Sequence, residues 1–258
     1  MSVRQVFELV DVQARMSLKA EASRLYLSYI WWVLEPILFI LVFYLVFEIL
    51  LNIGRENYLL FLICGKIPFL WFSKSVTNAS NSIVQNKGLI GQLDMPKYLF
   101  PYISIQESLY KQWVVFFVMF GVVITYGYLP EWNWLWLIPL MIAQYGLIVV
   151  FSLLAALMVS FIGDFRMLIN MGMMFLMFAS GIFWDINAIA DPQLREWVFI
   201  YNPMTFLIDG YRQVLMRQST YSLEHLVVLA SIILVGIVIS HQLLHKYSRI
   251  IAAKVVNS

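Results

Sequence analysis

Residues 24 to 51 of this chain read RLYLSYIWWVLEPILFILVFYLVFEILL and form its first long apolar segment. From Trp31 to Leu51 the segment is about 21 residues long, and its only charged side chains are Glu35 and Glu48, one near each end. With a rise of about 1.5 Å per residue, a helix of this length just crosses the hydrocarbon core of a bilayer, which is about 30 Å thick. The segment therefore predicts a membrane-spanning helix.

Aromatic side chains recur along this segment at a helical spacing. Phe39, Phe43 and Phe47 follow one another at intervals of four residues, so they would share one face of a regular α-helix. A segment that only anchors a chain needs no more than Leu, Ile and Val. The spacing therefore raises the question of what this aromatic face contacts.

The composition extends the membrane prediction to the whole chain. The 258 residues are 62% hydrophobic and 12% charged, with a mean hydropathy of +0.80, whereas soluble domains carry about 25% charged residues. The net charge of +2 gives no support for nucleic-acid binding. The single cysteine, Cys64, can form neither an internal disulfide nor a cysteine-based metal site, and the polar first 28 residues lead us to expect no cleavable signal peptide.

The order of apolar segments predicts an all-α polytopic protein with six transmembrane helices. An amphipathic helix in residues 1–28 precedes a transmembrane domain in 29–258; it is compatible both with the membrane interface and with packing on its own protein. Two amphipathic stretches, 190–200 and 204–216, predict short re-entrant helices in the last extracytoplasmic loop. The expected spans are about 31–51, 58–84, 103–127, 134–161, 167–184 and 223–245.

Two lysines and a run of methionines stand out within the spans. In the second span, Pro68 predicts a kink or a short re-entrant piece near Gly65–Pro68. We expect Lys66 to extend to the interface and Lys74 to face a watery cavity, because a lysine facing lipid is costly. The methionines of the fifth span are interpreted as flexible packing residues: Met167, Met171, Met173, Met174 and Met177.

The distribution of lysine and arginine predicts the orientation. Six spans place both termini on one side, and the segments on that side carry eleven Lys or Arg residues, against four in the opposite loops. Cytoplasmic loops carry the excess of basic residues. Both termini are therefore expected to be cytoplasmic.

Several kinds of chemistry are not expected in this chain. Gly65-Lys66 is not a nucleotide-binding loop, because Leu60 stands where the loop needs Gly and Ile67 where it needs Ser or Thr. His241 and His245 are four residues apart but have no nearby cysteine or carboxylate, so no metal site is expected. No acidic residue lies at mid-span, as an ion-coupled carrier would require, and no nucleophile stands out. The energy for any transport is expected to come from a cytoplasmic partner.

Four groups of residues carry a resemblance to a known family. In order and spacing, the sequence resembles the transmembrane subunits of type-2 ABC exporters, the permeases that export O-antigen, capsule and related polysaccharides. The resemblance covers nearly the whole chain. The residues that carry it are WWVLEP at 31–36, GKIPFLWF at 65–72, NKGLI at 86–90 with Pro96 and Pro101, and YNPMT at 201–205 before Tyr211-Arg212.

The resemblance implies a homodimer in the bacterial inner membrane, bound to two cytoplasmic ATPase subunits, with the pore between the two copies and lined by spans one and five. The chain itself would be no enzyme and would hold no cofactor, since ATP and magnesium would bind the partner ATPase. The 85–101 connector would couple to that ATPase, supported by the N-terminal helix. The candidate coupling residues are Lys87, Gln92, Asp94 and Lys97, with Arg15 and Lys19.

A polysaccharide gives the aromatic residues a possible role, because sugar faces stack on rings while their hydroxyls stay hydrated. The candidate channel residues are Phe39, Phe43 and Phe47, with Phe178, Phe183, Trp184 and Tyr201 opposite. The alternative is that these rings face lipid or pack inside the protein. Export of another amphiphile, such as a teichoic acid, a lipid or a drug, also stays open, as do an ion-coupled secondary transporter and a membrane-embedded transferase.

Overall fold

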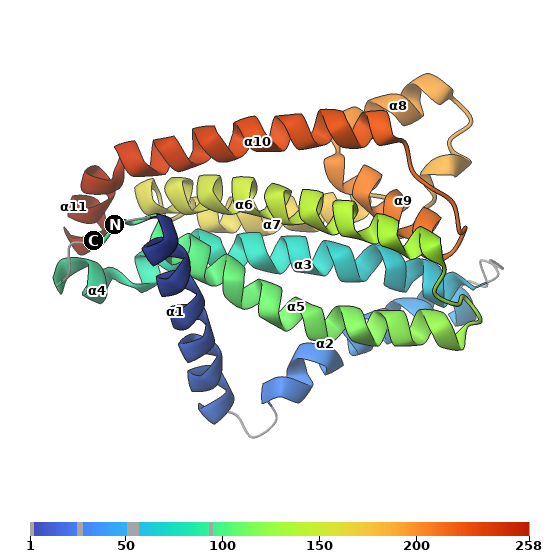
Figure 1. Cartoon of the computed structure of the whole chain (residues 1–258), viewed down its shortest axis with the longest axis horizontal. Helices are drawn as coiled ribbons and strands as arrows, with labels where there is room; N and C mark the ends of the chain where they lie inside the picture. Colours follow the sequence, from blue (N-terminus) through green and yellow to red (C-terminus); the bar gives the residue numbers. More distant parts are fainter. Residues whose placement is uncertain (1–2, 25–27, 51–56, 93–94, 258) are drawn as a thin grey trace.

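The computed structural model describes residues 3–24, 28–50, 57–92 and 95–257, and this part of the chain is helical, without a strand. The long helices run side by side, and both ends of the chain lie at the same end of the bundle (Figure 1). In chain order the elements are α1 (Val3–Arg24), α2 (Ser28–Tyr44), the π-helical η1 (Leu45–Leu50), α3 (Tyr58–Gln85), α4 (Lys87–Gln92), α5 (Leu99–Thr125), the 3₁₀-helical η2 (Trp132–Trp136), α6 (Leu137–Phe161), α7 (Phe165–Ala179), the 3₁₀-helical η3 (Ile186–Ala188), α8 (Pro192–Tyr201), α9 (Pro203–Leu215), α10 (Leu223–Lys246) and α11 (Ser248–Asn257).

Four of the described helical stretches are long and apolar enough to cross a membrane: Tyr58–Gln92, Leu99–Thr125, Trp132–Phe161 and Leu223–Lys246. The all-helical, polytopic class is thereby confirmed, whereas six spans remain a prediction. α2 continues without a break into η1, and α7 has only 15 residues. α7 ends at Ala179, before the end of the expected span 167–184, because the chain turns at Gly181 with a φ of +73°.

Helix α3 forms the centre of the bundle and packs against α2, α5, α6, α7 and α9. Its apolar window is 78% buried, whereas that of α10, on the outside, is 11% buried. Small residues permit the close packing of these helices. On α6, for example, a Cβ added to Gly146 would lie 2.6 Å from Cγ2 of Ile233 on α10.

The second span differs from the sequence prediction at two points. α3 runs through Pro68 as one helix, so no re-entrant piece forms at Gly65–Pro68. The expectation for Lys66 is wrong. Its side chain is 3% exposed, and Nζ lies 2.8 Å from Sδ of Met177 on α7. The packing of α7 against α3 encloses this lysine, which the sequence of α3 alone does not reveal.

Helix α1 crosses the bundle rather than running along it (Figure 1). Val10 and Ala14 are buried, Asp11 accepts a hydrogen bond from Tyr110 of α5, and Glu21 pairs with Lys111 of α5 at 2.6 Å. Phe7, which shares a face of α1 with Val10 and Ala14 by its helical spacing, is 71% exposed. One part of the amphipathic face therefore packs on the protein, and another part is free to contact a membrane interface.

Candidate translocation and coupling sites

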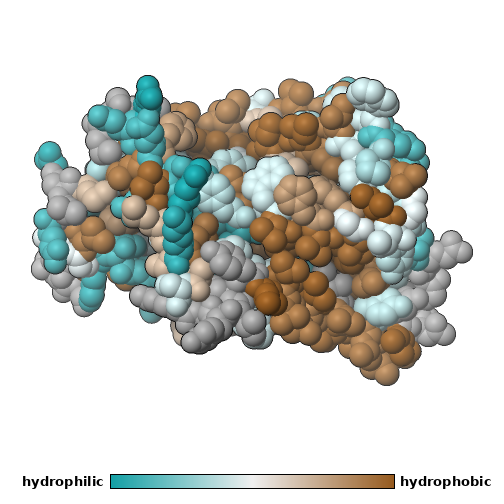
Figure 2. All heavy atoms as spheres, turned by 60° about the horizontal axis from the view of Figure 1, so that its bottom comes forward, coloured by the Kyte–Doolittle hydropathy of each residue, from teal (hydrophilic) through white to brown (hydrophobic). Residues whose placement is uncertain are grey.

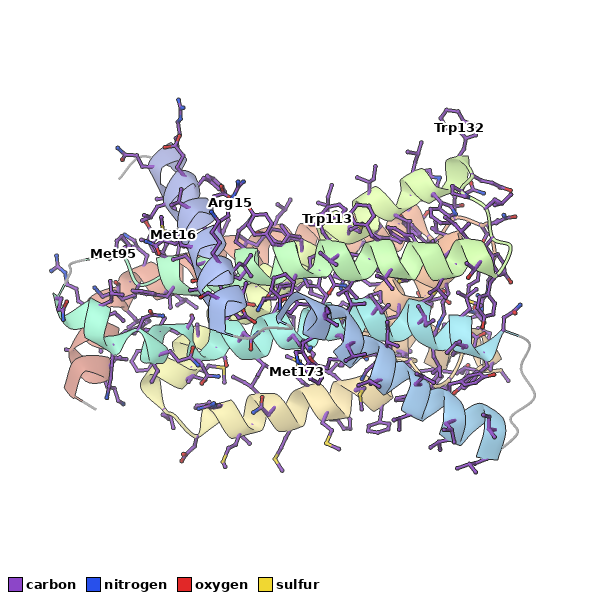
Figure 3. The ribbon with its side chains drawn as sticks, turned by 90° about the horizontal axis from the view of Figure 1, so that it is seen from below. Arg15, Met16, Met95, Trp113, Trp132 and Met173 are labelled. Carbon is purple, nitrogen blue, oxygen red and sulfur yellow. The ribbon has the colours of Figure 1, made fainter. Side chains whose placement is uncertain are left out.

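Helix α7 exposes one complete apolar face. The exposed side chains recur at helical spacing, and Met173 on the other side is 8% exposed (Figure 3). The interpretation of the methionines as flexible packing residues does not hold within this subunit for the exposed ones, because no element in the described part of the chain covers that side of α7. The exposed residues are Met167 (72%), Leu168 (59%), Met171 (70%), Met174 (64%), Phe175 (74%) and Phe178 (50%).

Helix α2 and η1 present a second exposed apolar surface. Hydrophobic residues dominate much of the molecular surface seen in Figure 2. The described exposed side chains on this segment include Ile37, Leu38, Leu41, Val42, Leu45 and Ile49. Because α2 and α7 both pack on α3, the two surfaces flank the same central helix.

The aromatic stripe predicted on span one lies outside the described side chains: Phe39, Phe43 and Phe47 belong to helices α2 and η1, but only their backbone is described. The backbone changes at Leu45 from α-helical to π-helical, in which the hydrogen bonds close from i to i+5. The regular α-helix assumed for the stripe therefore ends at Tyr44, and Phe47 lies in the π-helical part.

Three of the other predicted channel residues come together at the end of α7. The rings of Phe178 and Phe183 lie 5.4 Å apart at 34°, and Trp184 Nε1 donates a 2.8 Å hydrogen bond to the Phe178 carbonyl. Tyr201 is separate from this group. It is 73% exposed and stacks at 5.5 Å on Trp197, one helical turn earlier in α8. Trp197 is not among the channel residues predicted from the sequence, although its spacing of four residues from Tyr201 places the two rings on one face of a helix.

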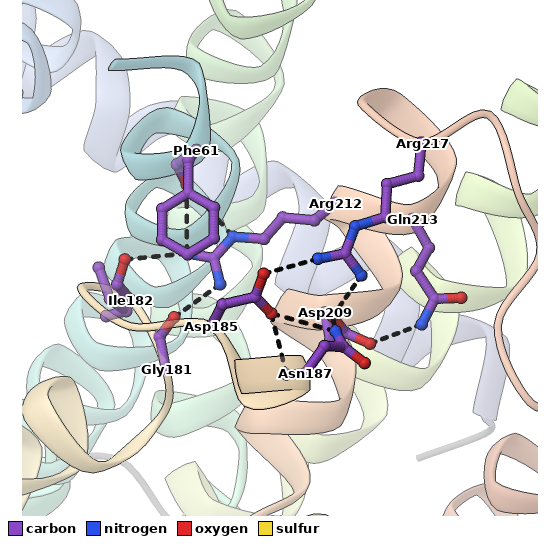
Figure 4. A network of polar contacts seen from close by, with 9 residues as sticks. All are labelled: Phe61, Gly181, Ile182, Asp185, Asn187, Asp209, Arg212, Gln213 and Arg217. Atoms are coloured by element: carbon purple, nitrogen blue, oxygen red, sulfur yellow. Dashed lines mark hydrogen bonds and ion pairs between the residues drawn. The ribbon is translucent and has the colours of Figure 1, made fainter. Parts of the chain in front are cut away.

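A buried arginine fixes the loop that follows α7. Arg212 of α9 is 2% exposed, and its guanidinium donates to the carbonyls of Phe61, Gly181 and Ile182 at 2.6 to 3.3 Å (Figure 4). The guanidinium carbon also lies 3.4 Å from the ring centre of Phe61. We call Phe61, Gly181, Ile182 and Arg212 the Arg212 cluster; it joins α3, α9 and the loop after α7.

A second polar group continues from the Arg212 cluster (Figure 4). Arg217 pairs with Asp185 at 2.8 Å and with Asp209 at 3.5 Å, and Asn187 donates to both carboxylates. Partial burial alone would raise the pKa of Asp185. The hydrogen bonds from Asn187 and the ion pair with Arg217 outweigh burial and hold this pKa below its ordinary value.

The YNPMT segment has a structural explanation in this region. Asn202 Nδ2 donates to the Ala179 carbonyl at 3.2 Å and to Ser180 Oγ at 3.0 Å, which ties the end of α7 to the joint between α8 and α9. Pro203 begins α9, where a missing backbone N–H costs nothing. The Asn-Pro pair therefore positions α9, and with it Arg212.

Of the predicted coupling residues, those on α4 lie at the opposite end of the bundle from the Arg212 cluster, where α4 packs beside α11 (Figure 1). Lys87 and Gln92 are exposed on α4, and Asp94 lies outside the described residues. Lys97 is 5% exposed and donates to the Met95 carbonyl at 2.7 Å, so its side chain shapes the connector instead of projecting from it. On α1, Arg15 and Lys19 are both exposed, and Arg15 pairs with Asp11 at 3.0 Å.

A polar cavity of about 680 Å³ lies between α1, α3, α5 and α7 near this end. Its lining is rich in amides, which can both donate and accept hydrogen bonds. In the described part of the chain no cluster of His, Cys, Asp and Glu could hold a metal ion. The lining includes Asn78, Asn81, Gln85, Asn86, Glu107, Arg166 and Asn170.

The bundle of long apolar helices, with its uncovered faces, defines a polytopic membrane subunit. Residues 13–216 match the family of ABC-2 type transporters, so the chain belongs to this family of membrane transport proteins. Among its relatives, the O-antigen export system permease protein RfbA of Klebsiella pneumoniae is 28% identical over 255 residues, 95% of this chain and 96% of the relative. The RfbA permease of Myxococcus xanthus is 24% identical over 234 residues, 89% of this chain and 90% of the relative. The family predicted from the four sequence motifs is confirmed.

Proposed function

We propose that this chain is the channel-forming subunit of an ATP-driven exporter that moves a lipid-linked polysaccharide, O-antigen or capsule, across the bacterial inner membrane. The observation that carries the proposal is the uncovered face of α7, flanked by exposed aromatic side chains at its end and on α8. In a membrane protein an apolar face of this kind contacts either lipid or another subunit. We propose that a second copy of the chain completes the wall of the channel.

The chemistry of the exposed side chains suits a polymer that must slide. Phe178, Trp197 and Tyr201 offer exposed rings on which sugars would stack with similar affinity. The flexible methionine side chains on α7 can adapt to different neighbours. The amide-lined cavity at the other end offers hydrogen bonds to hydroxyl groups. The similarity to O-antigen export permeases along nearly the whole chain supports a polysaccharide as the substrate.

In this proposal a partner ATPase supplies the energy for transport. We infer that α4 docks on a cytoplasmic ATPase through Lys87 and Gln92, with both termini on the same, cytoplasmic side and six spans in each subunit. The exposure of Lys87 and Gln92 and the position of α4 at the end of the bundle support this docking site.

The test is export by cells that carry this chain with its separately encoded ATPase. We expect surface polysaccharide to disappear when ATP hydrolysis by the ATPase is inactivated, and the ATPase to co-purify with the wild-type chain. Lys87→Glu with Gln92→Ala should reduce this co-purification, whereas Arg195→Glu on α8 is the control and should not. Export that continues without ATP hydrolysis but stops when the proton gradient is collapsed would contradict the proposal.

The aromatic surface is tested separately. Trp197→Ala with Tyr201→Ala should reduce the exported polymer while leaving the yield and dimer content of the purified protein unchanged. Trp132→Ala is the matched control, because Trp132 is 87% exposed but lies on η2 (Figure 3). If the double variant and the control export equal amounts of polymer, α8 does not line the channel.

A further inference from the structure

A second cavity, of about 360 Å³, lies where the end of α1 and the start of α2 meet the middle of α3 and α5. It is separate from the exposed face of α7 and from the Arg212 cluster. We call it the Trp71 cavity. Its polar and aromatic lining includes Glu21, Trp31, Glu35, Trp71, Lys74, Ser75, Lys111 and Gln112, and Lys74 thus faces a cavity as predicted from the sequence.

Three lining side chains are buried and have hydrogen-bonding atoms without a partner. Trp71 is 3% exposed, Ser75 0% and Gln112 7%, and Trp71 Nε1, Ser75 Oγ and Gln112 Nε2 have no hydrogen bond within the described part of the chain. Buried polar atoms in native proteins nearly always have a partner. The indole N–H and the amide NH₂ can only donate. A ligand that presents several acceptors, as a phosphate group does, would satisfy these donors.

The charges around the cavity are balanced. Lys74 pairs with Glu35, and Lys111 pairs with Glu21, each at 2.6 Å, and the Lys111 ammonium also lies 5.2 Å from the ring centre of Trp32. A simple anion would be attracted by the two lysines and repelled by the two glutamates. A ligand that carries both a phosphate and an ammonium group is complementary to these charges, because its phosphate attracts the lysines and its ammonium group attracts the glutamates.

The position of the cavity indicates where such a ligand would come from. The amphipathic helix α1 crosses the bundle of apolar helices at this level (Figure 1), as a helix in the membrane interface does. Tryptophan is typical of the same level, and Trp31 beside the cavity is 49% exposed. Exposed apolar side chains continue from the cavity along both neighbouring helices: Ile37, Leu38 and Leu41 on α2, and Trp113, Val114 and Phe117 on α5. They offer a surface for acyl chains.

We propose that the Trp71 cavity binds the phosphoethanolamine head group of a phospholipid. The phosphate oxygens accept hydrogen bonds from Trp71, Ser75 and Gln112, and the ammonium group lies beside Glu35. The bound lipid thus joins the start of α2 to α3 and α5. This site concerns the bilayer and not the exported molecule, so it is independent of the function proposed above.

The experiment uses the full chain, purified in detergent, stripped of lipid and studied by native mass spectrometry. Dioleoyl phosphatidylethanolamine and dioleoyl phosphatidylglycerol are titrated in parallel, because they share acyl chains and differ in the head group. We expect the ethanolamine lipid to bind about tenfold more tightly, as one additional hydrogen bond to a charged group would give. Equal binding of the two lipids, or no binding above background, would overturn the proposal.

Variants locate the site. Trp71→Phe with Ser75→Ala removes two donors to the phosphate, which both lipids carry, and should weaken the binding of both lipids about tenfold. The matched control is Trp134→Phe with Ser152→Ala, which removes two equally unpartnered buried atoms that do not line the cavity. Glu35→Gln removes the partner of the ammonium group and should abolish the preference for the ethanolamine lipid. Unchanged binding of both lipids by the double variant, or an unchanged preference in Glu35→Gln, would overturn the proposal. Displacement of the lipid by inorganic phosphate alone, or by a short oligosaccharide, would also overturn it in favour of a different ligand.

Discussion

The Arg212 cluster and the Trp71 cavity both place polar groups deep inside an apolar bundle, but their hydrogen bonding differs. All three guanidinium nitrogens of Arg212 donate to backbone carbonyls. In the Trp71 cavity, Trp71, Ser75 and Gln112 have atoms without partners in the described part of the chain. A fully paired buried group fixes the backbone around it, whereas an incompletely paired group is completed by a ligand or water.

This difference in hydrogen bonding indicates that the two regions have different roles. The Arg212 cluster holds the loop after α7 against α3, and so it sets where the exposed face of α7 ends. The Trp71 cavity lies at the junction of α1 and α2, where the protein supplies donors and a bound molecule supplies acceptors. Substitutions that change the pairing in each region test this distinction.

The largest effect is expected for Arg212→Leu. The substitution leaves the carbonyls of Gly181 and Ile182 without these donors in a buried site, which costs roughly 3 kcal/mol or more in total. We expect a loss of this size in the free energy of unfolding, measured by SDS titration in mixed micelles. Arg217→Gln is the control, because the Arg217 side chain is partly exposed and its ion pair with Asp185 contributes little. Equal losses in the two variants would show that the Arg212 cluster has no special role.

A smaller loss is expected for Gly65→Ala. A Cβ at this position would lie 2.6 Å from Nη2 of Arg212, so the guanidinium must move away from its carbonyl partners. Overpacking of this kind costs roughly 1–3 kcal/mol. Gly121→Ala on α5 has no atom within 4 Å of the new methyl group and should be neutral or stabilising. A neutral Gly65→Ala would mean that the guanidinium can bond equally well from a shifted position.

The next largest effect is a pH-dependent change in the free energy of unfolding, caused by Asp185 beside the Arg212 cluster. The pKa of Asp185 is held below the ordinary value of 3.8, so the ionised carboxylate stabilises the folded protein above that pH. This stabilisation is lost as the pH falls below 3.8 towards the lowered pKa. Since the group is only partly buried, Asp185→Asn should cost about 0.5 kcal/mol near neutral pH and less in acid. A constant difference between variant and wild type across this pH range would contradict the assignment.

The helices were predictable from the sequence where their own residues determine them. The stretches 58–84, 103–127, 134–161 and 223–245 correspond closely to α3, α5, η2 with α6, and α10, because long apolar runs demand helices. The paired helices α8 and α9 were also expected, since amphipathic spacing and the Asn-Pro joint are local signals.

The burial of individual side chains was not predictable in the same way. Lys66 and Arg212 are enclosed by α7 and by the loop that follows it, which are more than 100 residues away from Lys66 in the chain. Nothing in the neighbourhood of either residue reveals that contact. The same holds for Met171 and Met174, whose exposure results from the absence of a covering element in the described subunit.

The smallest effect is expected for Trp71→Phe. Its indole N–H is buried without a partner, so in lipid-free micelles the removal of an unsatisfied donor offsets part of the cost of the smaller ring. The change in the free energy of unfolding should therefore be small and similar to that of Trp134→Phe, which also removes an unpartnered indole N–H. Adding phosphatidylethanolamine should then stabilise the wild type and Trp134→Phe but not Trp71→Phe, because binding to the folded state alone stabilises it. A loss for Trp71→Phe that exceeds the loss for Trp134→Phe by more than about 1 kcal/mol without lipid would mean that Trp71 Nε1 is already paired within the protein, so that the Trp71 cavity and the Arg212 cluster would not differ in this respect.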